Sequence, residues 1–310
     1  MSEHEENEYL WNKSGTPDPE VRRLEDLLGR YRWTGKAVPE RPRGRLLRFR
    51  TALAVAAGIA AVALIAWALR GARADGYRVI GVPGRDIVRA GEELSTGARE
   101  GVRLEIGWLG HVDVDAGSRI GVRDDGKRVH RLFLERGRVR ARIWAQPRLF
   151  QIGTPAGNSI DLGCVYELDV ADDGTSRLSV TDGQVAFEFE GREVYVPEGA
   201  SCVSDPVRGP SAPVFDDAPT SYREALAAVE FAADPDPELV ARVLDTDREG
   251  TLTLWHLVTS ERAAESLRRA AYERLAKAFF QPDWVTEEGI LAGDPAMREA
   301  WVAEMKPAWR

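Results

Sequence analysis

The sequence contains few of the residues that most often bind metal ions. It has four histidines and two cysteines among 310 residues. The histidines lie far apart, and none stands at ligand spacing from another histidine or a cysteine; they are His4, His111, His130 and His256. We therefore expect no metal site and no cofactor.

The motifs of common enzyme classes are also lacking. The chain has no G-x-S-x-G turn, no phosphate-binding loop, no H-E-x-x-H and no nucleotide fingerprint. Carboxylates do occur in pairs, as at Asp113 and Asp115 or at Glu188 and Glu190. These pairs have the period of an exposed strand face, whereas acid–base catalysis needs a desolvated carboxyl group. We predict that the protein is not an enzyme.

A broad basic region is missing as well. The formal net charge is −8, and acidic residues dominate the extreme N-terminus and much of the last third of the chain. Basic residues concentrate just before residue 51. This distribution argues against a nucleic-acid partner.

The chain contains one long uncharged run, TALAVAAGIAAVALIAWAL at 51–69. As a helix it would span roughly 29 Å, close to the roughly 30 Å hydrocarbon core of a bilayer. We predict a transmembrane helix over 51–70. The alternatives are a buried core helix and a signal peptide cleaved near Ala72-Arg73-Ala74, although about fifty residues precede the run and a signal peptide has far fewer there.

The flanking charges predict the orientation of this helix. The segment RPRGRLLRFR at 41–50 carries five arginines, against Arg70 and Arg73 on the other side. Because basic residues near a membrane segment are retained in the cytoplasm, residues 1–50 are expected there. Residues 75–310 are then expected outside the cytoplasm of a single-pass membrane protein.

The cytoplasmic tail at 1–50 contains one predicted amphipathic helix. Asp18 is a plausible N-cap, and Pro19 suits the first helical position. Apolar residues follow at spacings of three and four, namely Val21, Leu24, Leu27, Leu28 and Tyr31. So short a helix is marginal alone, so the stripe either lies on the membrane surface or binds another protein.

Alternating apolar and polar residues between 77 and 203 predict about ten short strands. Glycine-containing turns such as Asp172-Asp173-Gly174 separate them. We expect an all-β domain over 75–205, either a sandwich or a solenoid-like roll. His111, Asp113 and Asp115 are expected to face outward, and the expected inward residues are Val112, Val114, Leu132, Leu134, Val139, Ala141 and Ile143.

Residues 204–219 are rich in proline, serine and aspartate and are interpreted as a linker. Helical periodicity then predicts an α-helical domain over 220–310, with paired antiparallel helices or a small bundle. The helices are expected to begin at Ser221, Asp236-Pro237, near Gly250, Ser260-Glu261 and Asp294-Pro295. Its expected core residues are Leu254, Trp255, Leu257, Leu267, Leu275 and Phe279. Trp284, Trp301 and Trp309 are expected in the core as well, with an exposed protein-binding face as the alternative.

Both cysteines, Cys164 and Cys202, lie in the predicted exterior part, where a disulfide is chemically permitted. Sequence does not tell whether they approach closely enough. A disulfide and two buried free thiols therefore both stay open.

Four segments of the β region resemble the FecR-like extracytoplasmic domain. In order, these are LERGRV at 134–139, FQIGTPAG at 150–157, DLGCVYEL at 161–168 and VTDGQV at 180–185. They are similar to that family's L-x-x-G-x-v, F-x-V-x-T-P-x-G, v-x-G-T-x-F-x-V and V-x-x-G-x-V steps. Cys164 and Tyr166 stand where the family usually has threonine and phenylalanine.

The resemblance implies a membrane-bound anti-sigma factor in the inner membrane, with its C-terminal domains in a periplasm. Its exterior β domain would sense an envelope protein or receptor, and its tail would regulate an extracytoplasmic-function sigma factor. The residues expected to contact the sigma factor are Leu10, Trp11, Val21, Leu24, Leu28 and Tyr31. The alternative is a membrane-tethered exterior scaffold that binds proteins or glycans and has no sigma-factor partner.

Overall fold

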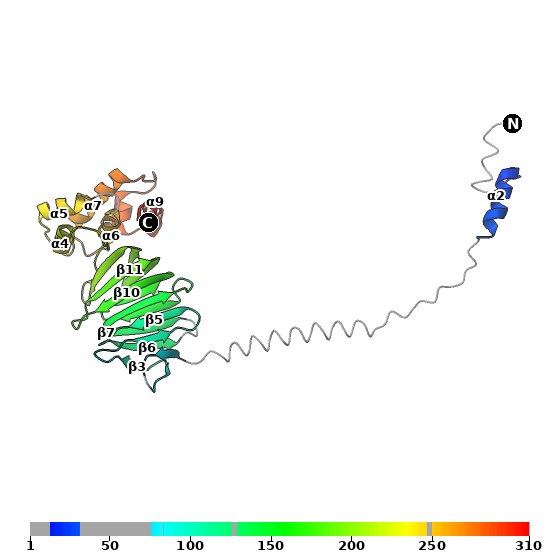
Figure 1. Cartoon of the computed structure of the whole chain (residues 1–310). Helices are drawn as coiled ribbons and strands as arrows, with labels where there is room; N and C mark the ends of the chain where they lie inside the picture. Colours follow the sequence, from blue (N-terminus) through cyan, green and yellow to red (C-terminus); the bar gives the residue numbers. More distant parts are fainter. Residues whose placement is uncertain (1–12, 32–75, 83, 126–128, 247–249, 310) are drawn as a thin grey trace. The chain divides into compact units, whose positions relative to one another are not determined.

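The computed structural model describes residues 13–31, 76–82, 84–125, 129–246 and 250–309. The chain divides into two units, Met1–Ala72 and Arg73–Arg310. The first contains the helix α2 (Pro19–Gly29), and the second contains the strands and the remaining described helices (Figure 1).

Helix α2 begins as the sequence predicts. The Asp18 carboxylate accepts the N–H of Glu20 at 2.8 Å, and Pro19 occupies the first turn. Both features satisfy or remove backbone donors that a helix N-terminus leaves without partners. No side chain of α2 is buried.

The described residues of the second unit form sixteen strands in one continuous hydrogen-bonded system. The strands are β1 Tyr77–Ile80, β2 Ile87–Val88, β3 Glu93–Ser95, β4 Val102–Glu105, β5 Gly110–Val114, β6 Arg119–Asp125, β7 His130–Ile143, β8 Phe150–Thr154, β9 Gly157–Asp161, β10 Cys164–Val170, β11 Ser176–Asp182, β12 Gln184–Phe189, β13 Arg192–Pro197, β14 Ala200–Asp205, β15 Gly209–Pro210 and β16 Val214–Phe215.

Strand β7 belongs to two sheets. Sheet A has the order β2-β1-β4-β5-β7-β10-β11-β14, with β15 and β16 beside β14. Sheet B has the order β3-β6-β7-β8-β9-β12-β13. All pairings are antiparallel except β7 with β8. The inward side chains of both sheets form one hydrophobic core, so the all-β part is a sheet rolled on itself through β7.

The change of sheet occurs at Gly137. Leu132 and Leu134 are buried before it, and Val139, Ala141 and Ile143 after it, so the buried positions change from even to odd numbers. One extra residue of β7 causes this change, since Arg119 pairs with Arg136 whereas the next residue of β6 pairs with Leu134. Such a bulge bends a strand and lets it turn the corner between two sheets.

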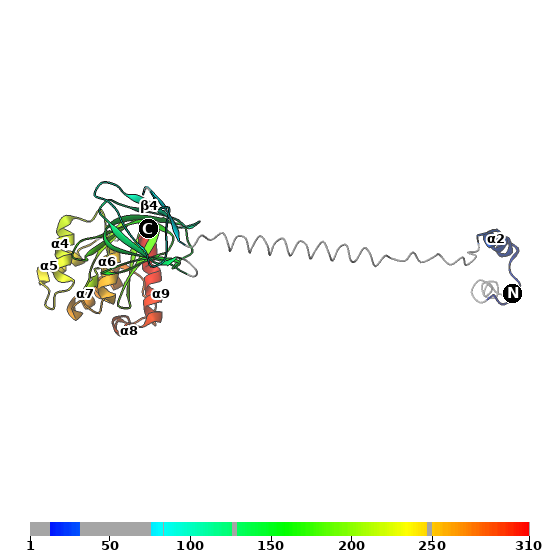
Figure 2. The same ribbon diagram turned by 90° about the horizontal axis from the view of Figure 1, so that it is seen from below.

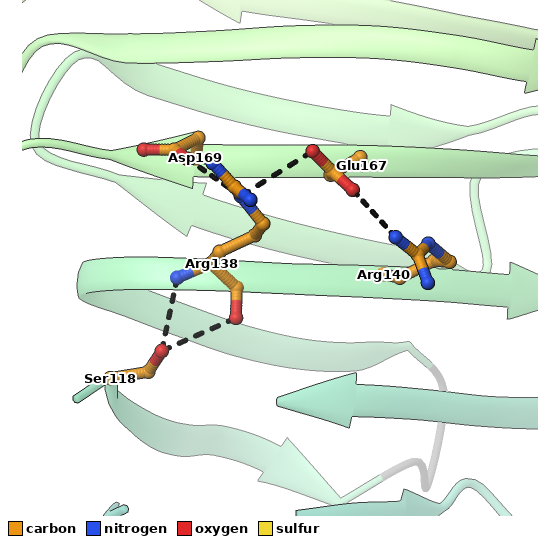
Figure 3. A network of polar contacts seen from close by, with 5 residues as sticks. All are labelled: Ser118, Arg138, Arg140, Glu167 and Asp169. Carbon is orange, nitrogen blue, oxygen red and sulfur yellow. Dashed lines mark hydrogen bonds and ion pairs between the residues drawn. The ribbon is translucent and has the colours of Figure 1, made fainter. Parts of the chain in front are cut away.

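Glycine is needed at this corner for two reasons. The φ of Gly137 is +92°, a conformation that L side chains rarely adopt. A Cβ there would also lie 2.6 Å from the Cα of Ser118. Ser118 is buried and holds the next residue, because its Oγ accepts the N–H of Arg138 at 3.0 Å and donates to the Arg138 carbonyl at 3.3 Å (Figure 3).

The predicted inward and outward faces of the strands are confirmed in most positions. All seven residues expected inside are buried. Asp115 is exposed, while His111 and Asp113 are half-buried on the outer face of sheet A. The Asp172-Asp173-Gly174 turn is also present, with a φ of +85° at Gly174.

The C-terminal region is helical, as expected. Its helices are α4 Thr220–Val229, α5 Pro237–Leu244, α6 Thr251–Thr259, α7 Glu265–Ala278, α8 Glu287–Ala292 and α9 Pro295–Met305, followed by the 3-10 turn η1 Lys306–Trp309. Asp236 and Asp294 cap α5 and α9 as predicted, but α7 begins four residues after Glu261. These helices gather on one side of the β strands (Figures 1 and 2).

Aromatic rings form much of the helical core. Trp301 is fully buried, 5.0 Å from the ring of Tyr272 and 6.0 Å from that of Trp255. Trp309 is buried too, and its Nε1 donates to Thr251 Oγ1 at 3.1 Å. The prediction of a core position is wrong for Trp284, which is 54% exposed, and Phe279 is only partly buried.

Residues 204–219 carry β15 and β16. Asp205 makes the turn that permits this, since its carboxylate accepts the N–H groups of Val207 and Arg208 at 2.8 and 2.9 Å. Proline is tolerated here because short edge strands leave some N–H positions without a required partner. The segment predicted as a linker therefore includes two strands that extend the edge of sheet A.

The predicted membrane span is not supported, and the fold class needs this correction. Among the described residues no helix has the length and hydropathy needed to cross a membrane. The longest of them, α7, has 14 residues and so measures about 21 Å, against roughly 30 Å for a bilayer core. The run at 51–69 lies outside the described residues. What the structure supports is a mostly β fold with a helical C-terminal region.

Both cysteines are free and buried. The Cys164 thiol donates to Asp161 Oδ1 at 2.9 Å, and Cys202 lies opposite Leu178 in sheet A. Burial raises the pKa of the Cys164 thiol well above its usual value and that of Cys202 to about 12. Both sulfurs are therefore protonated and unreactive near neutral pH.

The first prediction concerns the Gly137 corner. Gly137→Ala should lower the free energy of unfolding by about 2–5 kcal/mol, because backbone strain and overpacking add. Gly117→Ala is the matched control: its φ is +74°, but nothing lies within 4 Å of the added Cβ, so only the strain of about 1–2 kcal/mol is expected. Urea unfolding of the full chain measures both. Equal losses would contradict the role given to the Ser118 contact.

The second prediction concerns the thiols. Ellman's reagent at pH 8 should find almost no reactive thiol in the native full chain and two per chain in urea without reductant. A disulfide would instead leave no reactive thiol in urea, which would contradict the structure.

Candidate functional site

The candidate partner-binding surface is the apolar stripe of α2, defined here as Val21, Leu24, Leu27, Leu28 and Tyr31. The first four lie within α2 and, at 100° per residue, fall within about 120° of the helix circumference, and Tyr31 lies in the turn that follows Gly29. Leu24 and Leu28 are 57% and 65% exposed, and Tyr31 is 85% exposed. The stripe is therefore a continuous apolar face in contact with solvent.

The other face of α2 is charged. It carries Arg22, Arg23, Glu25 and Asp26, and Lys13 pairs with Glu25 at 2.9 Å. An exposed ion pair of this kind contributes at most about 1 kcal/mol. The helix thus lacks an internal source of stability that compensates for the exposed stripe, and burial on a partner would supply one.

Four of the six predicted contact residues lie in this stripe. Val21 is half-exposed, and Leu24, Leu28 and Tyr31 are exposed. Leu27 joins them at 53% exposure. Leu10 and Trp11 lie outside the described residues.

A second polar cluster lies on the outer face of sheet A, between β7 and β10 (Figure 3). The Arg138 guanidinium contacts Asp169 Oδ2 at 2.6 Å and Glu167 Oε1 at 3.4 Å, and Arg140 binds Glu167 Oε2 at 2.9 Å. All four side chains are between one third and three fifths exposed. The cluster forms a ladder of cross-strand ion pairs.

The same ladder continues to β4 and β5. Arg103 donates to both oxygens of Asp113, at 2.6 and 3.0 Å. This hydrogen bonding holds the pKa of Asp113 below its usual value, so the carboxylate stays ionised and paired. Paired, partly exposed carboxylates hold strands in register and contribute little chemistry.

The sequence analysis missed a buried charged pair between the strands and the helices. Glu230 follows α4 and is 1% exposed, and its Oε1 lies 3.9 Å from a guanidinium nitrogen of Arg192 on β13. The same oxygen accepts the N–H of Ala212 at 2.6 Å. Burial raises the pKa of Glu230 to about 7, against the opposing effects of Ala212 and Arg192. No local signal could reveal this pair, because its members lie 38 residues apart in sequence.

In the part of the chain that the structure describes, no group of three or more His, Cys, Asp or Glu side chains could hold a metal ion. The expectation that the protein is not an enzyme stays a prediction.

Comparison with solved structures finds two crystal structures described as a "putative anti-sigma factor" from Parabacteroides distasonis ATCC 8503. Each is 14% identical to this chain, with a TM-score of 0.34. In one case the match covers 44% of this chain and 65% of the other, and in the second 49% and 72%. The chain thus spans slightly less than two thirds of the first structure's length. A likeness this distant does not define function.

The comparison with protein families is more informative. No curated protein matches the chain. Residues 92–186 match the family described as FecR protein, a segment that runs from β3 into β12 and contains all four motifs recognised in the sequence. The predicted resemblance to the FecR family is therefore confirmed over residues 92–186.

Proposed function

We propose that this protein regulates a sigma factor and that the apolar stripe of α2 makes the contact. The single observation that carries the proposal is the stripe itself, an exposed apolar helix face attached to a chain with a FecR domain. Members of that family are regulators of extracytoplasmic-function sigma factors. A solvent-exposed stripe of this size on a short helix is typical of a segment that binds a groove in another protein.

The free energy of burying the stripe favours a helix α2 that is bound to a partner over one that is exposed to solvent. Full burial of one leucine side chain contributes about 1.5–3 kcal/mol. Three leucines are more than half exposed on α2, so their burial in a groove would offset the cost of ordering an eleven-residue helix. The capped N-terminus at Asp18 lowers that cost further, because it favours the bound conformation before contact.

In this proposal the rolled sheet receives the signal from an envelope protein. Two exposed tryptophans support such a role. Trp108 and Trp144 are 76% and 64% exposed, and the N–H of Trp144 donates to the carbonyl of Leu109, beside Trp108. Exposed aromatic side chains of this kind are enriched at the centres of protein interfaces.

The third prediction tests the α2 contact. Leu24→Asp together with Leu28→Asp should weaken capture of the cognate sigma factor by about 100-fold or more, because two buried leucines are lost and two charges are placed in an apolar groove. Arg23→Gln with Asp26→Asn on the opposite face is the matched control and should bind like the wild type. The measurement is a pull-down of the host's purified sigma factors with the full chain. Equal capture by both double variants would overturn the assignment of the stripe.

The fourth prediction concerns location, which stays an expectation from the basic segment before residue 51. Residues 1–50 are proposed to face the cytoplasm and residues 75–310 to lie outside it, in a periplasm. A reporter enzyme that is active only outside the cytoplasm should be active when fused after Arg310 and inactive when fused before Met1. The reverse pattern, or activity at neither end, would contradict this placement.

A further inference from the structure

A cavity of about 340 Å³ lies between α4 and the edge of sheet A. Strands β11 and β14 and the 208–214 segment line one side, and α4 with Glu230 and Phe231 lines the other. A volume of this size falls within the range of small-molecule sites in proteins. Its lining combines a buried carboxylate, apolar side chains and exposed arginines.

The carboxylate is that of Glu230, which is 1% exposed. The two contacts recorded for it with described residues, the Ala212 N–H at 2.6 Å and the Arg192 guanidinium at 3.9 Å, both involve Oε1. A buried carboxylate is costly unless donors surround it. Oε2 therefore remains available to accept a hydrogen bond from an occupant of the cavity.

Besides Glu230, three arginines and Asp205 contribute charged side chains to the lining of the cavity. Arg177 on β11 is exposed and makes no hydrogen bond or ion pair with the residues that the structure describes. Arg208 is exposed too, with its guanidinium 6.0 Å from the centre of the Phe231 ring. The third arginine, Arg223, is already engaged, because it donates to the carbonyl oxygens of Phe215 and Ala218. Neither the Arg177 nor the Arg208 guanidinium makes a close ion pair with a described residue, so both can bind an anion, although Asp205 also lines the cavity and competes for Arg208 through its charge.

Apolar side chains complete the lining. They are Ala212, Val214, Leu226 and Phe231. The surface therefore offers an acceptor for a donor group, an apolar stretch, and cations for a carboxylate.

We propose that this cavity binds a small ligand with a primary amine and a carboxylate joined by a short apolar spacer. The amine pairs with Glu230, the spacer covers the apolar lining, and the carboxylate binds Arg177 and Arg208. The proposal goes beyond sigma-factor regulation and does not depend on it, because the cavity and α2 belong to different units of the chain.

The charge state of Glu230 gives the proposal a pH signature. Its pKa of about 7 arises mainly from burial, and Arg192 of β13 and the Ala212 N–H oppose the rise. Cys202 of β14, with a pKa near 12, and His256 of α6, whose pKa burial lowers to about 3, are both neutral between pH 6 and 8. Ionisation of Glu230 should therefore strengthen amine binding about tenfold from pH 6 to pH 8.

The fifth prediction uses 6-aminohexanoate as the probe, with isothermal titration calorimetry on the full chain. Hexylamine and hexanoate, which each lack one charged group, should bind at least tenfold more weakly at pH 8. Glu230→Gln should weaken 6-aminohexanoate binding at least tenfold and abolish its pH dependence, because glutamine keeps the acceptor for Ala212 but loses the charge. Arg177→Gln with Arg208→Gln should also cost at least tenfold.

The control variant is Arg136→Gln, an exposed arginine of β7 outside the cavity, which should bind within twofold of the wild type. Thermal melting reports whether the Glu230→Gln variant still folds. If that variant does not fold, the arginine double variant, which changes only exposed side chains, tests whether the cavity binds the ligand. The proposal is overturned if neither 6-aminohexanoate nor its four- to eight-carbon homologues bind. It is equally overturned if both cavity variants bind like Arg136→Gln. Sigma-factor capture is measured separately, so a failure of ligand binding in the cavity and a failure of sigma-factor binding can be told apart.

Discussion

The β fold depends on one bent strand that serves two sheets. A strand exposes alternate side chains on opposite faces, so a strand that continues from one wall of a core into the other must shift its alternation by one residue. The extra residue of β7 makes this shift, and Gly137 with Ser118 shapes the bend. Without it, either Leu132 and Leu134 or Val139 and Ala141 would face solvent. The FecR motif glycine in LERGRV thus has a structural role.

The helical region is held to the roll by buried contacts of two kinds. Trp309 packs near Tyr195 of β13, with ring centroids 6.3 Å apart, and contributes apolar burial. Glu230 and Arg192 contribute a charged contact that removes both groups from most solvent. Buried pairs of this type are expensive to form, so their presence favours a role in geometry or ligand binding over a role in stability. The exposed ladder on sheet A contrasts with this, since its charges retain water and cost little.

The two candidate surfaces suit different kinds of partner. The stripe of α2 is apolar, exposed and on a short helix, which fits a protein groove. The cavity beside α4 is concave and is lined by side chains of both charges, which fits a small molecule. A ligand in that cavity would contact both the rolled sheet and the helices, and binding there would stabilise the arrangement of the two.

Local pattern was sufficient for much of this protein. Period-two alternation identified the inward residues of β5 and β7, cap residues located α2, α5 and α9, and four short motifs identified the resemblance to the FecR family.

The sequence alone could not determine the features that depend on contacts between segments far apart in the chain. Trp284 is an apolar residue of a type usually found in a core, but it lies at the surface. Residues 204–219 form strands because they pair with β14. The apolar run at 51–69 predicted a membrane span that the described structure does not support. Nothing in the local sequence sets Glu230 apart from other acidic residues, and only the tertiary structure brings Arg192 and Ala212 to it. Periodicity and capping act within a few residues, whereas burial and charge pairing depend on segments that only folding brings together.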